Sequence, residues 1–120
     1  MELSALKKQL AEYLSRRSLG ILEFFNVYCT LMYKTDCLTL LFTSPSKLYH
    51  IVLMHYKGDA ISADYVFTLI FLNPLALLLG REEIAGELLC LAKTGRDKDF
   101  AQMLTTLSSK LCVFSSHKEM

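Results

Sequence analysis

The sequence has almost no excess of charge of either sign, and this absence limits the partners that it can attract. It contains 13 lysine and arginine residues against 12 aspartate and glutamate residues, a formal net charge of +1 at pH 7. A chain without a strong overall field is not drawn as a whole onto nucleic acid or anionic lipid. Binding to either would have to come from a local patch.

Sequence motifs typical of catalysis and metal binding are also missing. No GxSxG, GxxxxGKS, GxxxxGKT or GxGxxG segment occurs, so the usual nucleophile elbow and the usual phosphate-binding loops are absent. There is no ExxH pair, and His50 and His55 would point about 140° apart on a helix, which prevents them from sharing an ion. The sequence therefore predicts a protein that is not an enzyme, with no cofactor and no metal site.

The four cysteines form no CxxC pair, because Cys29, Cys37, Cys90 and Cys112 are irregularly spaced. The chain begins MELSALKK rather than with basic residues followed by an apolar signal core. Isolated cysteines of this kind are typical of small buried residues in a reducing compartment. We therefore expect reduced core cysteines and a cytoplasmic protein.

Apolar residues are abundant and make up 52% of the chain. A chain of 120 residues suits one domain, which buries roughly two-thirds of its surface on folding. Residues 65–80 carry no charge, but as a helix they would span only about 24 Å, against roughly 30 Å for a hydrocarbon core. Within this segment, Asn73-Pro74 is typical of a helix cap followed by a proline at the first helical position. We therefore predict two short helices, 65–72 and 75–79, that meet at an angle.

Apolar residues spaced three and four apart, together with capping signals, predict helices along almost the whole chain. Besides the two just given, the expected ranges are 2–17, 21–34, 37–42, 45–57, 81–93 and 97–114. Residues 38–43 would suit a buried strand equally well on composition, and Ser62 or Asp64 is the expected cap of the first uncharged helix. The sequence thus predicts an all-α fold, a compact single-domain bundle of about five to seven short helices in residues 1–114, followed by a polar C-terminal tail, 115–120.

Segment 21–34 is apolar around most of its circumference, since its polar residues form only one narrow stripe. A helix of this kind is either central in a protein or faces a partner. Together with residues 65–79, it carries more apolar surface than one small core can hide. The candidate residues of a protein interface on these two segments are Phe24, Phe25, Tyr28, Val66, Phe67 and Ile70.

Residues 37–58 contain no acidic side chain and form the clearest local basic feature. On a helix, Lys47, His50 and Lys57 would fall within about 80° of one another. Such a face can bind phosphates, and the interleaved Tyr49 and Tyr56 could stack on a base or ribose. The alternative is an ordinary solvated face.

These features favour a non-catalytic assembly subunit of a larger complex, which packs against partner proteins or copies of itself. The alternative is a small subunit that contacts nucleic acid. In size and helical class the chain is similar to the all-helical small subunits of CRISPR effector complexes, an analogy of fold alone. A third interpretation, a small membrane-associated protein, depends only on the apolar run at residues 65–80.

Overall fold

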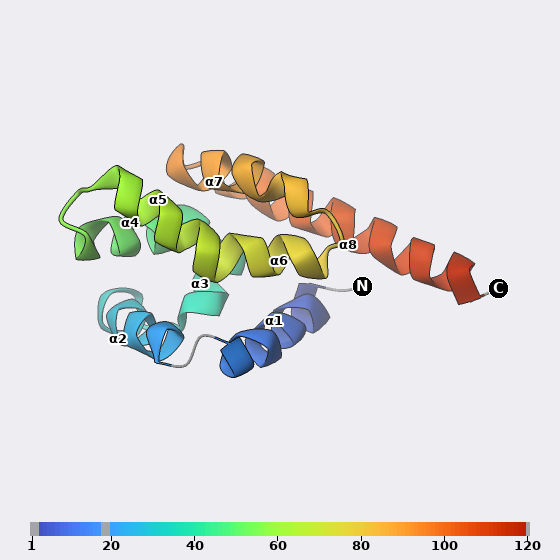
Figure 1. Ribbon diagram of the computed structural model, residues 1–120, viewed down its shortest axis with the longest axis horizontal. Helices are drawn as coiled ribbons and strands as arrows, with labels where there is room; N and C mark the ends of the chain where they lie inside the picture. The colour runs from blue at the N-terminus through green and yellow to red at the C-terminus, as the bar shows by residue number, and fades with distance from the viewer. Residues whose placement is uncertain (1–2, 18–19, 120) are drawn as a thin grey trace.

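The computed structural model describes residues 3–17 and 20–119, with side chains as far as Ser108. These residues form seven helices and no strand, which confirms the all-α prediction. In chain order they are α1 (Leu3–Arg17), α2 (Ile21–Tyr33), α3 (Cys37–Thr43), α4 (Pro45–His55), one long helix, α7 (Ala85–Lys93) and α8 (Asp97–Glu119), as Figure 1 shows. The long helix consists of α5 (Ala60–Phe67), η1 (Thr68–Leu72) and α6 (Asn73–Leu78). A short turn, η2 (Glu82–Ile84), precedes α7.

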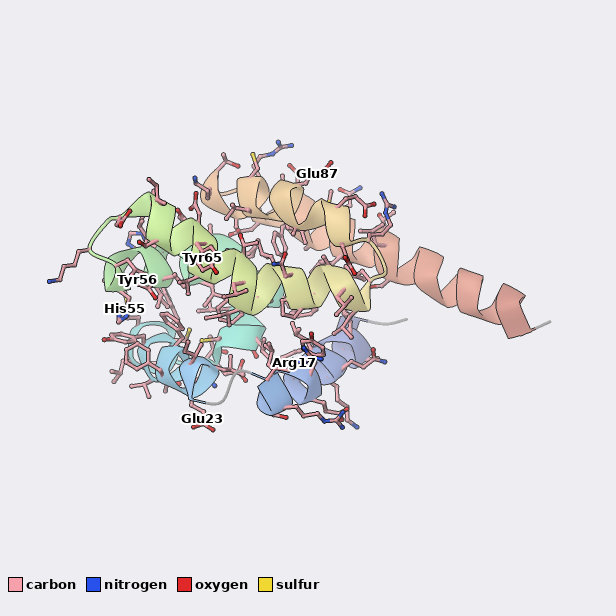
Figure 2. All side chains as sticks on the ribbon, viewed as in Figure 1. Arg17, Glu23, His55, Tyr56, Tyr65 and Glu87 are labelled. Carbon is pink, nitrogen blue, oxygen red and sulfur yellow. The ribbon has the colours of Figure 1, made fainter. Side chains whose placement is uncertain are left out.

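The long helix from Ala60 to Leu78, called the central helix below, provides much of the hydrophobic core. Its Phe67, Phe71, Leu72 and Leu75 are fully buried. It packs against α1, α4 and α7, and in Figure 1 it runs between α1 below and α7 above. Figure 2 shows that side chains from all of these helices fill the spaces between the ribbons. The chain therefore has one continuous core.

The predicted break at Asn73-Pro74 is wrong, because the central helix continues through it. A proline inside an α-helix normally clashes with the carbonyl group four residues before it. Here the turn Thr68–Leu72 is a π-helix, in which the Asn73 N–H group donates to the Thr68 carbonyl, five residues back. The wider turn shifts the carbonyl groups that precede Pro74, so the helix accommodates the proline ring.

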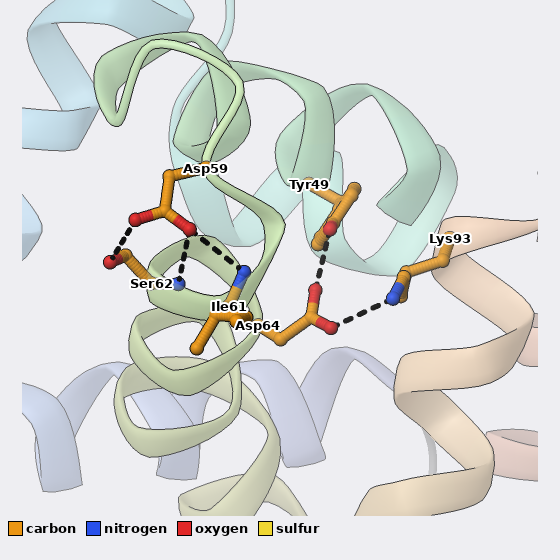
Figure 3. Close-up of polar contacts among 6 residues, drawn as sticks. All are labelled: Tyr49, Asp59, Ile61, Ser62, Asp64 and Lys93. Carbon is orange, nitrogen blue, oxygen red and sulfur yellow. Dashed lines mark hydrogen bonds and ion pairs between the residues drawn. The ribbon is translucent and has the colours of Figure 1, made fainter.

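The start of the central helix also differs from the prediction, which named Ser62 or Asp64 as its cap. The cap is Asp59: its carboxylate accepts hydrogen bonds from the backbone N–H groups of Ile61 and Ser62, and from the Ser62 hydroxyl at 2.8 Å (Figure 3). Gly58, at a φ of 85°, turns the chain between α4 and this cap. The helix therefore begins earlier than the uncharged run.

The central helix is consequently the one helix among the described residues that is long and apolar enough to cross a membrane by length and composition. Core helices of globular bundles meet the same criterion, and the buried face of this helix packs inside the bundle. Its outward stripe is apolar too, with Ile61, Tyr65, Leu69 and Leu77 exposed. Membrane association stays a prediction.

The starts of α3 and α4 agree with their predicted positions. The Asp36 carboxylate accepts a 2.7 Å hydrogen bond from the Thr39 N–H group, so residues 38–43 are helical and the strand alternative is wrong. Pro45 occupies the first turn of α4, but Ser44 makes no side-chain cap. Instead, the Asp97 carboxylate at the start of α8 accepts hydrogen bonds from the backbone N–H group and the hydroxyl of Ser46, at 3.0 and 2.9 Å.

Helix α8 continues through most of the segment expected to be a polar tail. Its backbone is helical as far as Glu119, and Figure 1 shows its C-terminal turns extending beyond the other helices. Met120 lies outside the described residues. Within the bundle, α8 buries the apolar stripe formed by Phe100, Leu104 and Leu107.

We predict that Leu107→Ala lowers the free energy of unfolding by about 2–5 kcal/mol, because a large core side chain is replaced by a cavity. Leu107 is only 8% exposed. Chemical denaturation measures the change, and the exposed Gln102 of the same helix supplies the control: Gln102→Ala should change stability by under about 0.5 kcal/mol. Equal midpoints for Leu107→Ala and wild type would show that the stripe is not part of the core.

Candidate functional site

Helix α2 carries more exposed large apolar side chains than any other helix among the described residues, and it buries only Phe25 and Cys29 completely. At about 100° per residue, its solvent-facing apolar side chains fall within an arc of about 140° around the helix axis. Each of them is between 38% and 75% exposed: Ile21, Phe24, Val27, Tyr28, Leu31 and Met32. Single exposed apolar residues are ordinary, whereas a contiguous group of this kind marks an interaction surface.

This apolar surface continues onto the end of α4. Tyr28 and Met32 of α2 line a shallow pocket of about 190 Å³ together with Ile51, Met54 and His55 of α4 and with Lys57. Met54 is itself half exposed. We call the surface formed by the six exposed apolar residues of α2 and by this pocket the α2–α4 face.

Aromatic rings hold the α2–α4 face in shape. The His55 ring lies edge-on to Phe24 and to Tyr56, with 4.9 Å between ring centroids in both cases, and 6.1 Å from Tyr28. Figure 2 shows His55 and Tyr56 at the end of α4, directly beside α2. Because edge-to-face packing restrains each ring, the aromatic part of the face is preformed.

The structure divides the six predicted interface residues into three groups. Phe24 and Tyr28 belong to the α2–α4 face, and Val66 is partly exposed on the central helix. Phe25, Phe67 and Ile70 are at most 5% exposed and pack inside the core, so the structure contradicts the prediction that these three contact a partner. In a helix, adjacent residues point about 100° apart, and the sequence pattern did not separate Phe24 from Phe25.

Several exposed apolar residues were not among the predicted interface residues. Leu31 is the most exposed large apolar residue of α2, at 75%, and Ile61 and Tyr65 of the central helix are 84% and 67% exposed. The polar stripe of α2 does not identify Leu31, because Leu31 and the buried Cys29 both lie about 100° from Thr30, on opposite sides of it. Ile61 was missed because the start of its helix was placed too late.

In the predicted phosphate-binding face, the three basic residues are exposed, but neither tyrosine is. Lys47, His50 and Lys57 are all exposed. The Lys47 ammonium lies 5.2 Å from the centroid of the Tyr33 ring on α2. Tyr56 is half-buried beside His55, where its ring is already packed.

The structure contradicts the prediction that Tyr49 stacks on a nucleotide, because its side chain is buried. Its hydroxyl donates a 2.5 Å hydrogen bond to the Asp64 carboxylate, which also forms a 2.7 Å ion pair with Lys93 (Figure 3). These interactions join α4, the central helix and α7. Burial, followed by the hydrogen bond to Asp64 and the negative charge of that carboxylate, raises the pKa of the Tyr49 hydroxyl above its ordinary value.

A second shallow pocket, of about 280 Å³, lies between α8 and the turn before α7. Its charged lining includes Arg81, Glu83 and Glu87, and the Arg81 guanidinium is paired with Glu83. The described residues that line it include no cysteine, histidine or serine. Elsewhere in residues 3–17 and 20–108, no three histidine, cysteine or acidic side chains lie close enough together to hold a metal ion.

Comparison of the chain with models of known protein families, with curated proteins and with solved structures finds no match. Function therefore has to be inferred from the surface of the chain itself. The α2–α4 face is the candidate that its geometry supports best.

We predict that Tyr49 ionises at a higher pH than an ordinary tyrosine side chain. Its raised pKa means that the folded state favours the neutral hydroxyl, so this contribution to stability is complete below the ordinary pKa of about 10 and is lost as the pH rises above it. Ultraviolet absorbance of tyrosinate measures the titration. Tyr49→Phe should remove the step at the highest pH, whereas the control Tyr65→Phe, at a side chain 67% exposed, should leave that step in place.

Proposed function

We propose that this protein is a non-catalytic assembly subunit that binds a partner protein through the α2–α4 face. The observation that carries the proposal is the exposed apolar arc of α2, which lies beside a polar stripe of the same helix. Glu23 and Thr30, two residues of that stripe, lie about 20° apart around the helix axis. The helix thus has a solvated side as well as its buried side, and the third side, apolar and exposed, suits contact with another protein.

The energetics of α2 favour a partner. Burying one large apolar side chain contributes about 1.5–3 kcal/mol relative to leaving it in water. Within the chain, α2 gains this contribution fully at Phe25 and Cys29, while six large apolar residues remain exposed. A helix of this length is marginal in water without packing. A partner on the α2–α4 face would therefore stabilise α2 and bury the remaining apolar surface.

The charges around the face indicate the chemistry of that partner. Lys57 lines the pocket, Lys47 lies over Tyr33 of α2, and neither α4 nor the segment from it to Lys57 contains an acidic residue. Complementary charge steers association and disfavours wrong partners. The occupant that fits is an amphipathic helix with apolar side chains on one face and acidic residues along the edge of that face.

We predict that Leu31→Glu weakens binding of such a helix by about tenfold to a hundredfold, the equivalent of removing one large buried side chain. The probe is a synthetic amphipathic peptide with leucine on one face and glutamate along its edge, compared with the same peptide carrying lysine in place of glutamate. Thr30→Glu is the matched control, because it adds the same charge one residue away on the polar stripe. Fluorescence anisotropy measures the dissociation constants.

The wild-type chain should bind the acidic peptide more tightly than the basic one, and Thr30→Glu should retain that preference. Light scattering on the same samples reports the mass of the chain. A dimer that dissociates in Leu31→Glu would identify a second copy of the chain as the occupant. A monomer that binds neither peptide would contradict the proposal.

The second candidate function, contact with nucleic acid, is favoured by one observation, the exposure of Lys47, His50 and Lys57. If these residues bind phosphates, the double variant Lys47→Glu/Lys57→Glu should bind single-stranded RNA more weakly. Its slope of log affinity against log salt should be shallower by about 0.7–0.9 for each phosphate that is no longer neutralised. The control Lys8→Glu/Arg16→Glu makes the same change of charge at exposed residues of α1. Identical slopes for both variants and wild type would exclude this function.

A further inference from the structure

Two of the cysteines lie together in the core. Cys29 of α2 and Cys37, the first residue of α3, are both completely buried, and their sulfur atoms are 2.9 Å apart. The third described cysteine, Cys90, is exposed on α7, so the prediction that it is a core residue is wrong. Eight residues apart in sequence, the two buried cysteines meet because the chain reverses direction between the two helices.

The reversal is held at both ends by hydrogen bonds of the backbone. Lys34 adopts a left-handed conformation, with a φ of 58°, and its N–H group donates to the Thr30 carbonyl at the end of α2. The Cys37 N–H group donates a 2.8 Å hydrogen bond to the Asn26 side chain, which lies one turn before Cys29 on α2. These hydrogen bonds keep the two thiols facing each other.

The thiol–thiol hydrogen bond makes the two groups chemically unequal. The bond with Cys37 lowers the pKa of Cys29, because a neighbouring thiol stabilises the thiolate. The same bond, followed by burial and by the negative charges of Cys29 and Asp36, raises the pKa of Cys37. Since the thiolate is the nucleophile, this pair can present one reactive sulfur and keep the other protonated.

We infer that Cys29 and Cys37 are a site of reversible disulfide formation, with hydrogen peroxide as the oxidant. The Cys29 thiolate attacks one peroxide oxygen, the O–O bond breaks, hydroxide leaves, and a sulfenic acid forms. The Cys37 sulfur then attacks the Cys29 sulfur, the S–O bond breaks, and the S–S bond forms. The departing hydroxide takes up the Cys37 proton and leaves as water. Overall, two thiols are oxidised and one peroxide is reduced to two waters.

The geometry requires little rearrangement for this step. The two sulfur atoms have to approach from 2.9 Å to about 2.05 Å, the length of a disulfide bond. Both cysteines are buried, so hydrogen peroxide, a small molecule, has to reach them through a local opening at the end of α2. The bond would tie α2, which carries the exposed apolar arc, to α3. This inference does not depend on whether the α2–α4 face binds a partner.

The test uses the full chain with Cys90→Ser and Cys112→Ser, which leaves only the buried pair. After treatment of the native protein with hydrogen peroxide, we expect a non-reducing peptide map to contain a Cys29–Cys37 crosslink, two hydrogen atoms lighter than the sum of its two reduced peptides. The denaturation midpoint should rise, because the crosslink restricts the unfolded chain, and should return to its starting value with dithiothreitol. Cys37→Ser in the same background should instead gain one oxygen atom and show no rise.

The peptide map needs no substitution at the pair itself, so the inference is tested even if Cys37→Ser does not fold; Cys37→Ala then serves as the second control. Two results would overturn the inference. One is that both thiols survive a peroxide treatment that oxidises Cys90 in the wild-type chain. The other is that the crosslink forms only after denaturant is added.

Discussion

The arrangement of the other helices depends on the central helix remaining intact through Pro74. The π turn at Thr68–Leu72 shifts the backbone carbonyls that precede Pro74, so the buried residues before and after this proline belong to one continuous helix. Phe67 and Phe71 precede Pro74, and Leu75 follows it. Had the chain bent at Asn73, these side chains would not have shared one face. The packing of α1 and α7 onto this helix, and so the single core of the bundle, follows from that continuity.

The fold class and most helix boundaries could be predicted because their signals are local. Asp36 caps α3, Pro45 begins α4, and Asp97 begins α8, each within a few residues of the element that it controls. The error at Pro74 has a non-local cause. The local rule says that proline starts or ends a helix, but burial of side chains on both sides of it favoured an intact helix, and only the tertiary structure contains that information.

The candidate site could be predicted to the level of a segment but not of individual residues. The composition of residues 21–34 indicated that α2 faces a partner, because too few polar residues were available to solvate it. Which apolar residues are exposed depends on how α2 is rotated against α3 and α4. Tyr49 is a second example, because its place among basic residues in the sequence indicated a surface position. In the structure, the hydrogen bond to Asp64 and the packing of its ring against Phe67, with 5.5 Å between ring centroids, hold Tyr49 inside the bundle.

The hydrogen bonds between Ser46 and Asp97 have a consequence for how the chain folds. They join residues 51 apart in sequence, and they tie the first turn of α4 to the first turn of α8. Most other interactions of this helical bundle are local, which favours rapid folding, whereas an interaction across such a distance requires closure of a long loop and forms late. A late interaction contributes little to the folding rate and acts mainly by slowing unfolding. The Asp97 carboxylate is therefore expected to slow unfolding of the bundle more than it speeds folding.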